Sequence, residues 1–248
     1  MSRQDMDFTI DAYAELVSAA AARYRFLRFA ESSTEGEVAL WRHDIDFSPQ
    51  RALALARVEA ASGVPATYFV QVSSRYYSIF EPEIAAILRQ IVALGHDIGL
   101  HFDAEVCAYQ SVPDFDKRIA FEASALEEIV EARVASFTLH NPTTLVGVSL
   151  DEPLRAGLVN GSCSEFRAAY AYCSDSNGLW RYRSLAEMIA DPAIGRLYAL
   201  THPEWWQVEP MPPRQRLQRC IDGRAEFCSR YYDGLLEENN RPNIGAQR

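Results

Sequence analysis

Two aspartates at the end of an apolar run have a spacing that is typical of an active site. The run covers residues 38–46 and includes both Asp44 and Asp46. Side chains alternate between the two faces of a strand, so these aspartates would project from one face and His43 and Ile45 from the other. Neighbouring carboxylates repel each other unless a cation neutralises them or a proton lies between them. The pair therefore indicates a bound metal ion or an acid–base pair.

Other ionisable residues lie at the ends of three further predicted strands. His101 and Asp103 end one strand, and His140 and His202 each directly follow another. Helical segments alternate with these strands, which predicts a mostly parallel sheet whose carboxyl ends meet at one edge. Asp and His side chains gathered there are the ligands expected for zinc or a similar divalent ion, with positions left open for water and substrate.

Length and patterning indicate one domain. A chain of 248 residues with 48% hydrophobic residues suits a single α/β domain over 1–248. Helical spacing predicts an outer helix at each end of the domain, at residues 9–29 and 214–236. The polar segment 237–248 is predicted to be a flexible tail.

Composition excludes several classes of function. The formal net charge of -10, with no local basic cluster, argues against a nucleic-acid partner. No apolar run is long enough to span a membrane, and the first residues lack the features of a signal peptide, so we expect a soluble cytoplasmic protein. The five cysteines contain no C-x-x-C pair, which indicates neither a disulfide framework nor a cysteine zinc site.

Four pieces of the sequence occur in a recognisable order: RHDIDFS (42–48), ATYF (66–69), GHDIGLH (95–101) and LTHP (200–203). In this order they resemble the motifs of the NodB-like polysaccharide deacetylase superfamily, which comprises carbohydrate esterase family 4 and its relatives. The resemblance covers residues 40–203. It implies an α/β fold, a distorted (β/α) barrel of about seven strands.

The resemblance also implies roles for individual residues. Asp44 matches the catalytic base, Asp46 the metal-binding aspartate and His101 the first histidine ligand of a divalent ion, zinc above all. His202 matches the general acid. His140-Asn141-Pro142 falls where the family carries a motif with arginine and proline, and Asp175 falls near a later aspartate motif.

The sequence departs from the family pattern at two points. The second histidine ligand is expected four residues after the first, where Glu105 stands, so Glu105, Asp103 or His140 could complete the site. We favour His140, because imidazole suits zinc and its strand ends at the same edge. The usual arginine that orients the base is also absent, which leaves Arg42, on the same strand face as Asp44, or Arg181.

Aromatic and polar residues near these motifs could contact a substrate. Trp205 and Trp206 closely follow His202 and could stack on a sugar ring or pack in the core. Three polar residues could contact the substrate or support the residues that do: Asp175, Asn141 and Arg181. His43 and His96 are expected to be structural, because one points away from the aspartates and the other begins its strand at the far end.

The sequence is therefore interpreted as a metal-dependent hydrolase that removes an acetyl or formyl group from an N-acylated sugar or polysaccharide precursor. Bacterial surface polysaccharide biosynthesis is the expected setting. Two alternatives stay open at this stage. One is a hydrolase of another carbon–nitrogen bond in a small molecule, and the other is a catalytically silent carbohydrate-binding relative, which Glu105 in place of a histidine makes conceivable.

Overall fold

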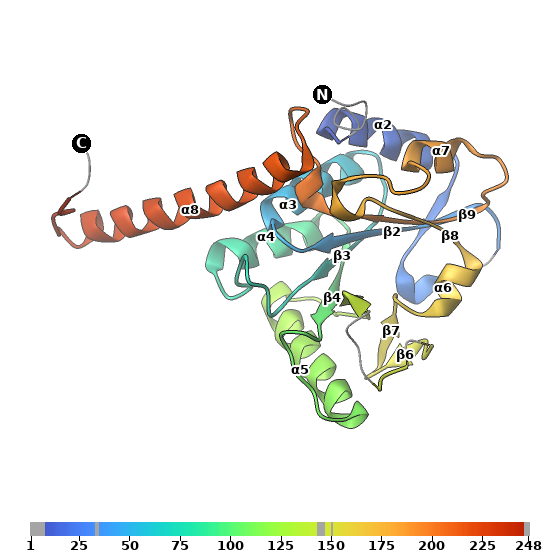
Figure 1. Ribbon diagram of the computed structural model, residues 1–248, viewed down its shortest axis with the longest axis horizontal. Helices are drawn as coiled ribbons and strands as arrows, with labels where there is room; N and C mark the ends of the chain where they lie inside the picture. Colours follow the sequence, from blue (N-terminus) through green and yellow to red (C-terminus); the bar gives the residue numbers. More distant parts are fainter. Residues whose placement is uncertain (1–7, 33–34, 143–146, 150, 246–248) are drawn as a thin grey trace.

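A curled sheet runs through the middle of the computed structural model, which describes residues 8–32, 35–142, 147–149 and 151–245 (Figure 1). Every ladder between the described strands is parallel except that of β6 with β7. The strands follow the order β6 (Leu154–Arg155), β7 (Leu158–Asn160), β5 (Ser136–His140), β4 (Asp97–Asp103), β3 (Thr67–Val70), β2 (Val38–Ile45), β9 (Arg196–Thr201) and β8 (Ala171–Ser174).

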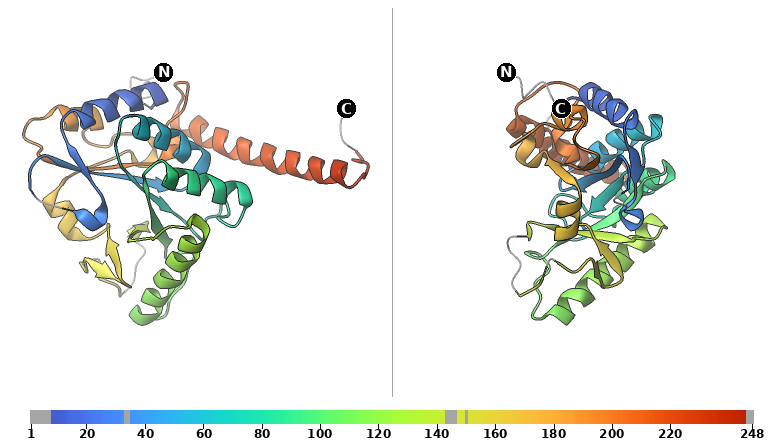
Figure 2. Two further views of the ribbon diagram at one scale, coloured as in Figure 1. Left: turned by 180° about the vertical axis from the view of Figure 1, so that it is seen from behind. Right: turned by 90° about the vertical axis from the view of Figure 1, so that its right-hand side faces the viewer.

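The sheet curls but stays open. Among the described strands no ladder joins β6 to β8, the two ends of the order. The end-on view in Figure 2 shows the curled sheet with helices along its outer side. The predicted distorted (β/α) barrel is therefore confirmed, in the form of an open, curled sheet.

Helices connect the parallel strands and pack beside one another. The connecting helices are α3 (Pro49–Ala61), α4 (Pro82–Ala93) and α5 (Val112–Val130), with α2 (Ile10–Ala21) against α3. Their starts were predictable from cap chemistry: the Ser48 hydroxyl accepts the Arg51 N–H, and Pro49 occupies the first turn of α3. Two short helices, α6 (Ser164–Ala169) and α7 (Leu185–Ala190), flank β8.

The first helix is shorter than predicted. The expected helix over 9–29 ends at Ala21, and Arg25–Leu27 instead forms strand β1, which pairs with the first half of β2. Arg23 donates hydrogen bonds to backbone carbonyls of residues 189, 191 and 194, which holds the chain in its turn toward the sheet. Pairing with a distant strand thus outweighs local helical spacing at these residues.

The last helix, α8 (Pro213–Glu238), matches the prediction closely and extends away from the sheet (Figure 1). The predicted tail over 237–248 begins inside this helix, and its last part, 246–248, lies outside the described residues. No helix in the described part of the chain has the length and apolar character needed to cross a membrane.

Strand β2 is the centre of the fold, because all eight of its residues are buried. Its outward face carries His43, whose Nε2 lies 2.5 Å from Glu59 Oε1 on α3. Glu59, fully buried, also accepts hydrogen bonds from the hydroxyls of Tyr68 and Tyr13. On the other side of the ring, His43 Nδ1 lies 2.6 Å from the Thr201 hydroxyl of β9. His43 thus has the structural role expected from strand alternation.

We expect Glu59→Gln to lower the free energy of unfolding by about 2–4 kcal/mol, because one amide cannot satisfy the donors that now share the carboxylate. Urea unfolding followed by circular dichroism measures the change. Glu15→Gln, on the exposed side of α2, is the matched control and should change the value by less than about 0.5 kcal/mol. Equal midpoints for the two variants would contradict the role of Glu59.

Candidate active site

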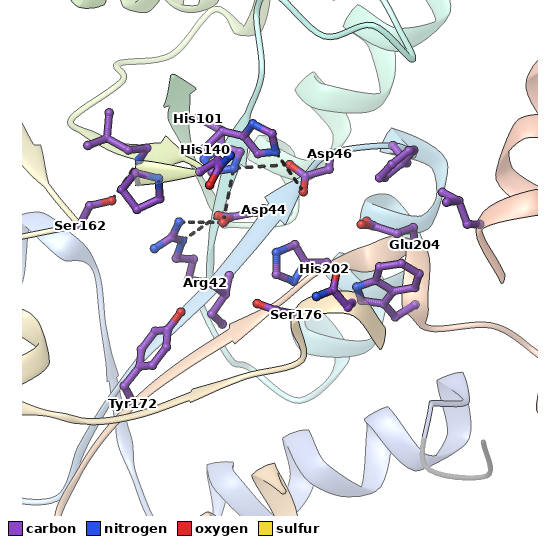
Figure 3. Close-up of a pocket in the computed structure, with 18 of the residues that line it drawn as sticks. Arg42, Asp44, Asp46, His101, His140, Ser162, Tyr172, Ser176, His202 and Glu204 are labelled. Carbon is purple, nitrogen blue, oxygen red and sulfur yellow. Dashed lines mark hydrogen bonds and ion pairs between the residues drawn. The ribbon is translucent and has the colours of Figure 1, made fainter. Parts of the chain in front are cut away.

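A cavity of about 500 Å³ opens where the carboxyl ends of β2, β4, β5 and β9 meet. That volume is typical of sites for small ligands. Asp44 and Asp46 come from β2 and the residues after it, His101 from β4, His140 from β5 and His202 from the position after β9, and all five line the cavity (Figure 3). The strand ends predicted to share an edge therefore do so.

Asp44 is held by Arg42 from the same strand. The Arg42 guanidinium donates two hydrogen bonds to the Asp44 carboxylate, from Nε at 2.7 Å and from Nη2 at 2.6 Å. Burial alone would raise the pKa of Asp44, but the charge of Arg42 lowers it below its ordinary value. Asp44 is therefore ionised at neutral pH, with its orientation fixed by a two-point contact.

Asp46 and His101 face each other across the cavity floor. Asp46 Oδ1 lies 3.4 Å from His101 Nε2 and also accepts a hydrogen bond from the Gln71 amide at 2.8 Å. The other ring nitrogen, His101 Nδ1, lies 2.9 Å from the buried Thr138 hydroxyl. A ring proton on Nδ1, donated to Thr138, would leave the lone pair of Nε2 toward Asp46, which is the arrangement typical of a metal-ligating histidine.

His140 approaches the same carboxylate from β5. Its Nε2 lies 4.0 Å from Asp46 Oδ2, and its ring centroid is 5.4 Å from that of His101. Its Nδ1 is 3.2 Å from Asp103 Oδ2, yet it makes no hydrogen bond with a described residue, so Asp103 holds the ring loosely. Asp103 Oδ1 is engaged by the backbone N–H of Glu105.

These distances test whether the side chains fit a divalent ion. In a tetrahedral zinc site with bonds of 2.0–2.1 Å, ligand atoms are about 3.3 Å apart. The Asp46–His101 pair matches this spacing, whereas the Asp46–His140 pair is wider. Among the described residues, no group of three or more His, Cys, Asp or Glu side chains is arranged closely enough to hold a metal ion. One carboxylate and two Nε2 atoms are donors of the types that zinc accepts, and of the two pairs that Asp46 makes with these rings, the one with His101 has ligand spacing.

Glu105 lies at the rim and not at the floor. Its side chain is exposed, and its Oε1 accepts a hydrogen bond from the Asn141 amide at 2.9 Å. Asn141 adopts a left-handed backbone conformation (φ 47°) and lines the cavity, while Glu105 does not. Of the three alternatives for the remaining ligand, His140 is the one placed beside Asp46.

His202 is fixed by Asp175, a fully buried carboxylate. Asp175 lies 2.6 Å from His202 Nδ1 and accepts the His202 backbone N–H and the Trp206 indole N–H. Burial alone would lower the pKa of His202, but the hydrogen bond and charge of Asp175 raise it to about 10. The imidazole is therefore a cation at neutral pH, with Nε2 left for a substrate.

The remaining predicted residues divide between the cavity and its surroundings. Trp205 lines the cavity. Trp206 is fully buried between Phe8 and Tyr13 and donates its indole N–H to Asp175, so of the two alternatives left open for it, sugar stacking and core packing, it packs in the core. Arg181 is exposed and lies outside the cavity lining, so Arg42 is the arginine beside Asp44.

Sequence reasoning missed Glu204. It stands in a short 3₁₀ turn after His202, is 1% exposed, and neither carboxyl oxygen has a hydrogen-bond partner among the described residues. Burial raises the pKa of Glu204 well above its ordinary value, and the charge of Asp46 raises it further. Figure 3 shows its carboxyl pointing toward Asp46 and His202. Its position two residues after His202 was the available signal.

Comparison with known proteins gives matches of fold alone. Neither the family models nor the curated proteins contain a match. Among solved structures, a family 4 acetyl xylan esterase from Clostridium thermocellum, in complex with a cobalt ion, is similar at 17% identity and a TM-score of 0.39 over 82% of this chain and 92% of that one. A family 4 carbohydrate esterase from Bacillus anthracis is similar at 12% identity and a TM-score of 0.42, over 86% of each chain.

A third similar structure is a mutant of a family 4 pseudoenzyme from Bacillus anthracis with restored enzymatic activity, at 11% identity and a TM-score of 0.43. This match covers 78% of the present chain but only 64% of the other. Two of these three structures are described as family 4 esterases and the third as a mutant of a family 4 pseudoenzyme.

Proposed function

We propose that this protein is a metal-dependent hydrolase that removes an acetyl or formyl group from the nitrogen of a sugar. One observation carries the proposal. An ionised carboxylate, Asp44, and an imidazolium, His202, line one cavity, and each is fixed by its own buried partner of opposite charge. The sugar class rests on the motif resemblance, and a role in bacterial surface polysaccharide biosynthesis is part of the same proposal.

Asp46, His101 and His140 would hold the divalent ion, with zinc the proposed metal. The chemistry available from a bound divalent ion here is a lowered pKa of water and a polarised acyl oxygen. Gln71 and Thr138 keep Asp46 and His101 in place through the hydrogen bonds described above. These contacts support the two donors that already have the right spacing.

The two fixed charges divide the proton transfers. Asp44 accepts a proton from the attacking water while oxygen bonds to the acyl carbon. His202 then donates its Nε2 proton to the leaving nitrogen as the carbon–nitrogen bond breaks. The products are an amine on the sugar and a carboxylic acid. Arg42 keeps Asp44 pointing at the water, and Asp175 keeps His202 charged.

The metal assignment predicts an ordering of variants. The wild-type chain should bind one Zn²⁺ or Co²⁺, and His140→Gln should weaken that affinity by about 100-fold. Removing a residue that only supports a metal ligand typically weakens metal affinity by about 10–100-fold, and removing a ligand should cost at least as much. Glu105→Gln should leave the affinity unchanged, since Glu105 lies at the rim. Competition with a chelator measures affinity, and the Co²⁺ absorption spectrum reports the ligand set.

If Glu105→Gln weakened the metal affinity and His140→Gln did not, the third ligand would be Glu105 and not His140. Acetate or formate release from N-acyl sugars then tests the activity itself. A chain that binds the ion but hydrolyses only cyclic amides would favour the alternative carbon–nitrogen hydrolase. A protein that binds sugars but neither binds the ion nor hydrolyses N-acyl sugars would favour the silent carbohydrate-binding relative.

A further inference from the structure

The mechanism leaves one cation of the cavity unused. Arg167, on α6, is exposed and lines the cavity. Its guanidinium carbon lies 5.7 Å from the centroid of the Tyr172 ring, in a cation–π contact. Tyr172 in turn packs edge-on against Tyr198, with ring centroids 5.3 Å apart. Tyr198 accepts a hydrogen bond from Arg42, so this aromatic pair connects Arg167 to the side chain that orients Asp44.

Charge balance distinguishes Arg167 from the other cations. Arg42 is matched by Asp44 and His202 by Asp175. No ion pair joins Arg167 to a carboxylate within the described ranges of the chain. In a protein of net charge -10, an unmatched guanidinium facing a cavity is a local site for an anion. Its planar donors suit a carboxylate or a phosphate, which they can bind at two points.

The sheet register places the backbone of Tyr172, the contact of Arg167, at a defined distance from His202. Tyr172 pairs with Tyr198, four residues before His202 along β9. At about 3.3 Å per residue, Tyr172 lies roughly 13 Å of strand from the level of His202. Figure 3 shows Tyr172 at the opposite end of the cavity from Asp46 and Glu204. Measured along the strand, the separation of these two backbone positions exceeds one sugar ring.

We propose that Arg167 and Tyr172 form a subsite for an anionic group, a carboxylate or a phosphate, carried one sugar unit away from the N-acyl group. This inference rests on the proposed function, because it names the class of acyl sugar that the site accepts. The Arg167 guanidinium binds the anion, and the partly exposed Tyr172 ring contacts the sugar that bears it. The preferred substrate is thus an acidic N-acyl saccharide.

Three probes of similar size test the subsite against the zinc-loaded protein. They are N,N′-diacetylchitobiose, which is neutral, a disaccharide of glucuronic acid and N-acetylglucosamine, and N,N′-diacetylchitobiose that carries a phosphate on one ring. Calorimetry measures binding, and acetate release measures turnover. The wild-type chain should bind one of the anionic probes about 10-fold more tightly than the neutral one or better, because hydrogen bonds to charged groups are the strong ones. The identity of that probe separates carboxylate from phosphate.

The variants sharpen the test. Arg167→Ala should remove the anion preference, a loss of about 10–100-fold, and leave diacetylchitobiose binding within about twofold. Arg167→Lys should retain part of the preference. Arg181→Ala, an exposed arginine outside the cavity, is the matched control. Added salt should weaken the anionic probe more than the neutral one.

Two results would overturn the subsite. One is equal or weaker binding of both anionic probes, and the other is an equal effect of Arg167→Ala and Arg181→Ala. These results are distinct from failure of the proposed function. Anion-selective binding without acetate release would retain the subsite and reject the hydrolase, whereas acetate release without anion selectivity would do the reverse.

Discussion

Asp44→Asn should reduce kcat for acyl-sugar hydrolysis by about 10³–10⁴-fold, toward the upper end of what a positioned proton acceptor contributes. The amide has nearly the shape of the carboxylate but cannot take up the proton of the attacking water. It also leaves the Arg42 guanidinium, 5% exposed, beside a neutral group. We expect affinity for substrate to change much less than kcat, because the interaction matters in the transition state.

The measurement is acetate release under saturating substrate, with metal content determined on the same sample. Asn at position 44 should retain bound zinc, since Asp46 and His101 supply the donors at ligand spacing. Arg42→Lys is a companion variant that keeps the charge but loses the two-point contact, and a smaller loss of kcat is expected. Full activity in Asp44→Asn would reject Asp44 as the base, and lost zinc would reassign it to the metal.

Asp175→Asn should change the pH dependence of turnover more than its maximum. His202 must be protonated to act as the acid, and its pKa is raised from 6.5 to about 10 by the hydrogen bond and charge of Asp175 above all, with the charges of Asp46 and Glu204 adding to them. Activity that depends on protonated His202 is therefore retained below the pKa and lost as pH rises through it. With the pKa returned to 6.5, the protonated fraction at pH 9 is roughly 1 in 300, so kcat should fall by about 300-fold there.

Near pH 5.5 the same variant should lose far less, since both forms of the enzyme then carry a protonated imidazole. A kcat profile from pH 5 to 10 shows the shift, and NMR titration of the His202 ring reports its pKa independently of turnover. Trp206→Phe serves as a control, because it removes one hydrogen-bond donor to Asp175 but leaves the negative charge of Asp175 in place. Parallel profiles for wild type and Asp175→Asn would contradict the role of Asp175.

The parts of the site that were predictable depend on geometry within one strand or one helix start. Alternation along residues 42–46 placed Arg42, Asp44 and Asp46 on one face and His43 on the other, and the structure has them so. The parallel arrangement of strands follows from the alternation of β and α segments and brings His101 and His202 to the same edge. Local rules carry this information, since the neighbours that matter lie within a few residues.

The parts that were not predictable depend on distant partners. Strand β1 forms because it pairs with β2, which is distant in the sequence. Helical spacing alone predicts that the first helix continues through these residues. The sequence leaves Trp206 as either a sugar-stacking or a core residue, and it is buried by two distant residues, Phe8 and Tyr13. Glu204 is made unusual by burial beside Asp46, which no local pattern reveals.

The pairing of Arg42 with Asp44 has a consequence for divergence among related sequences. Both partners belong to β2 and are separated by one residue, so a single strand encodes the base and the group that orients it. The segment after β5 does not supply the partner of Asp44, so a change of sequence there leaves the Arg42–Asp44 pair in place, and substrate preference can change while the base and its orienting group are kept.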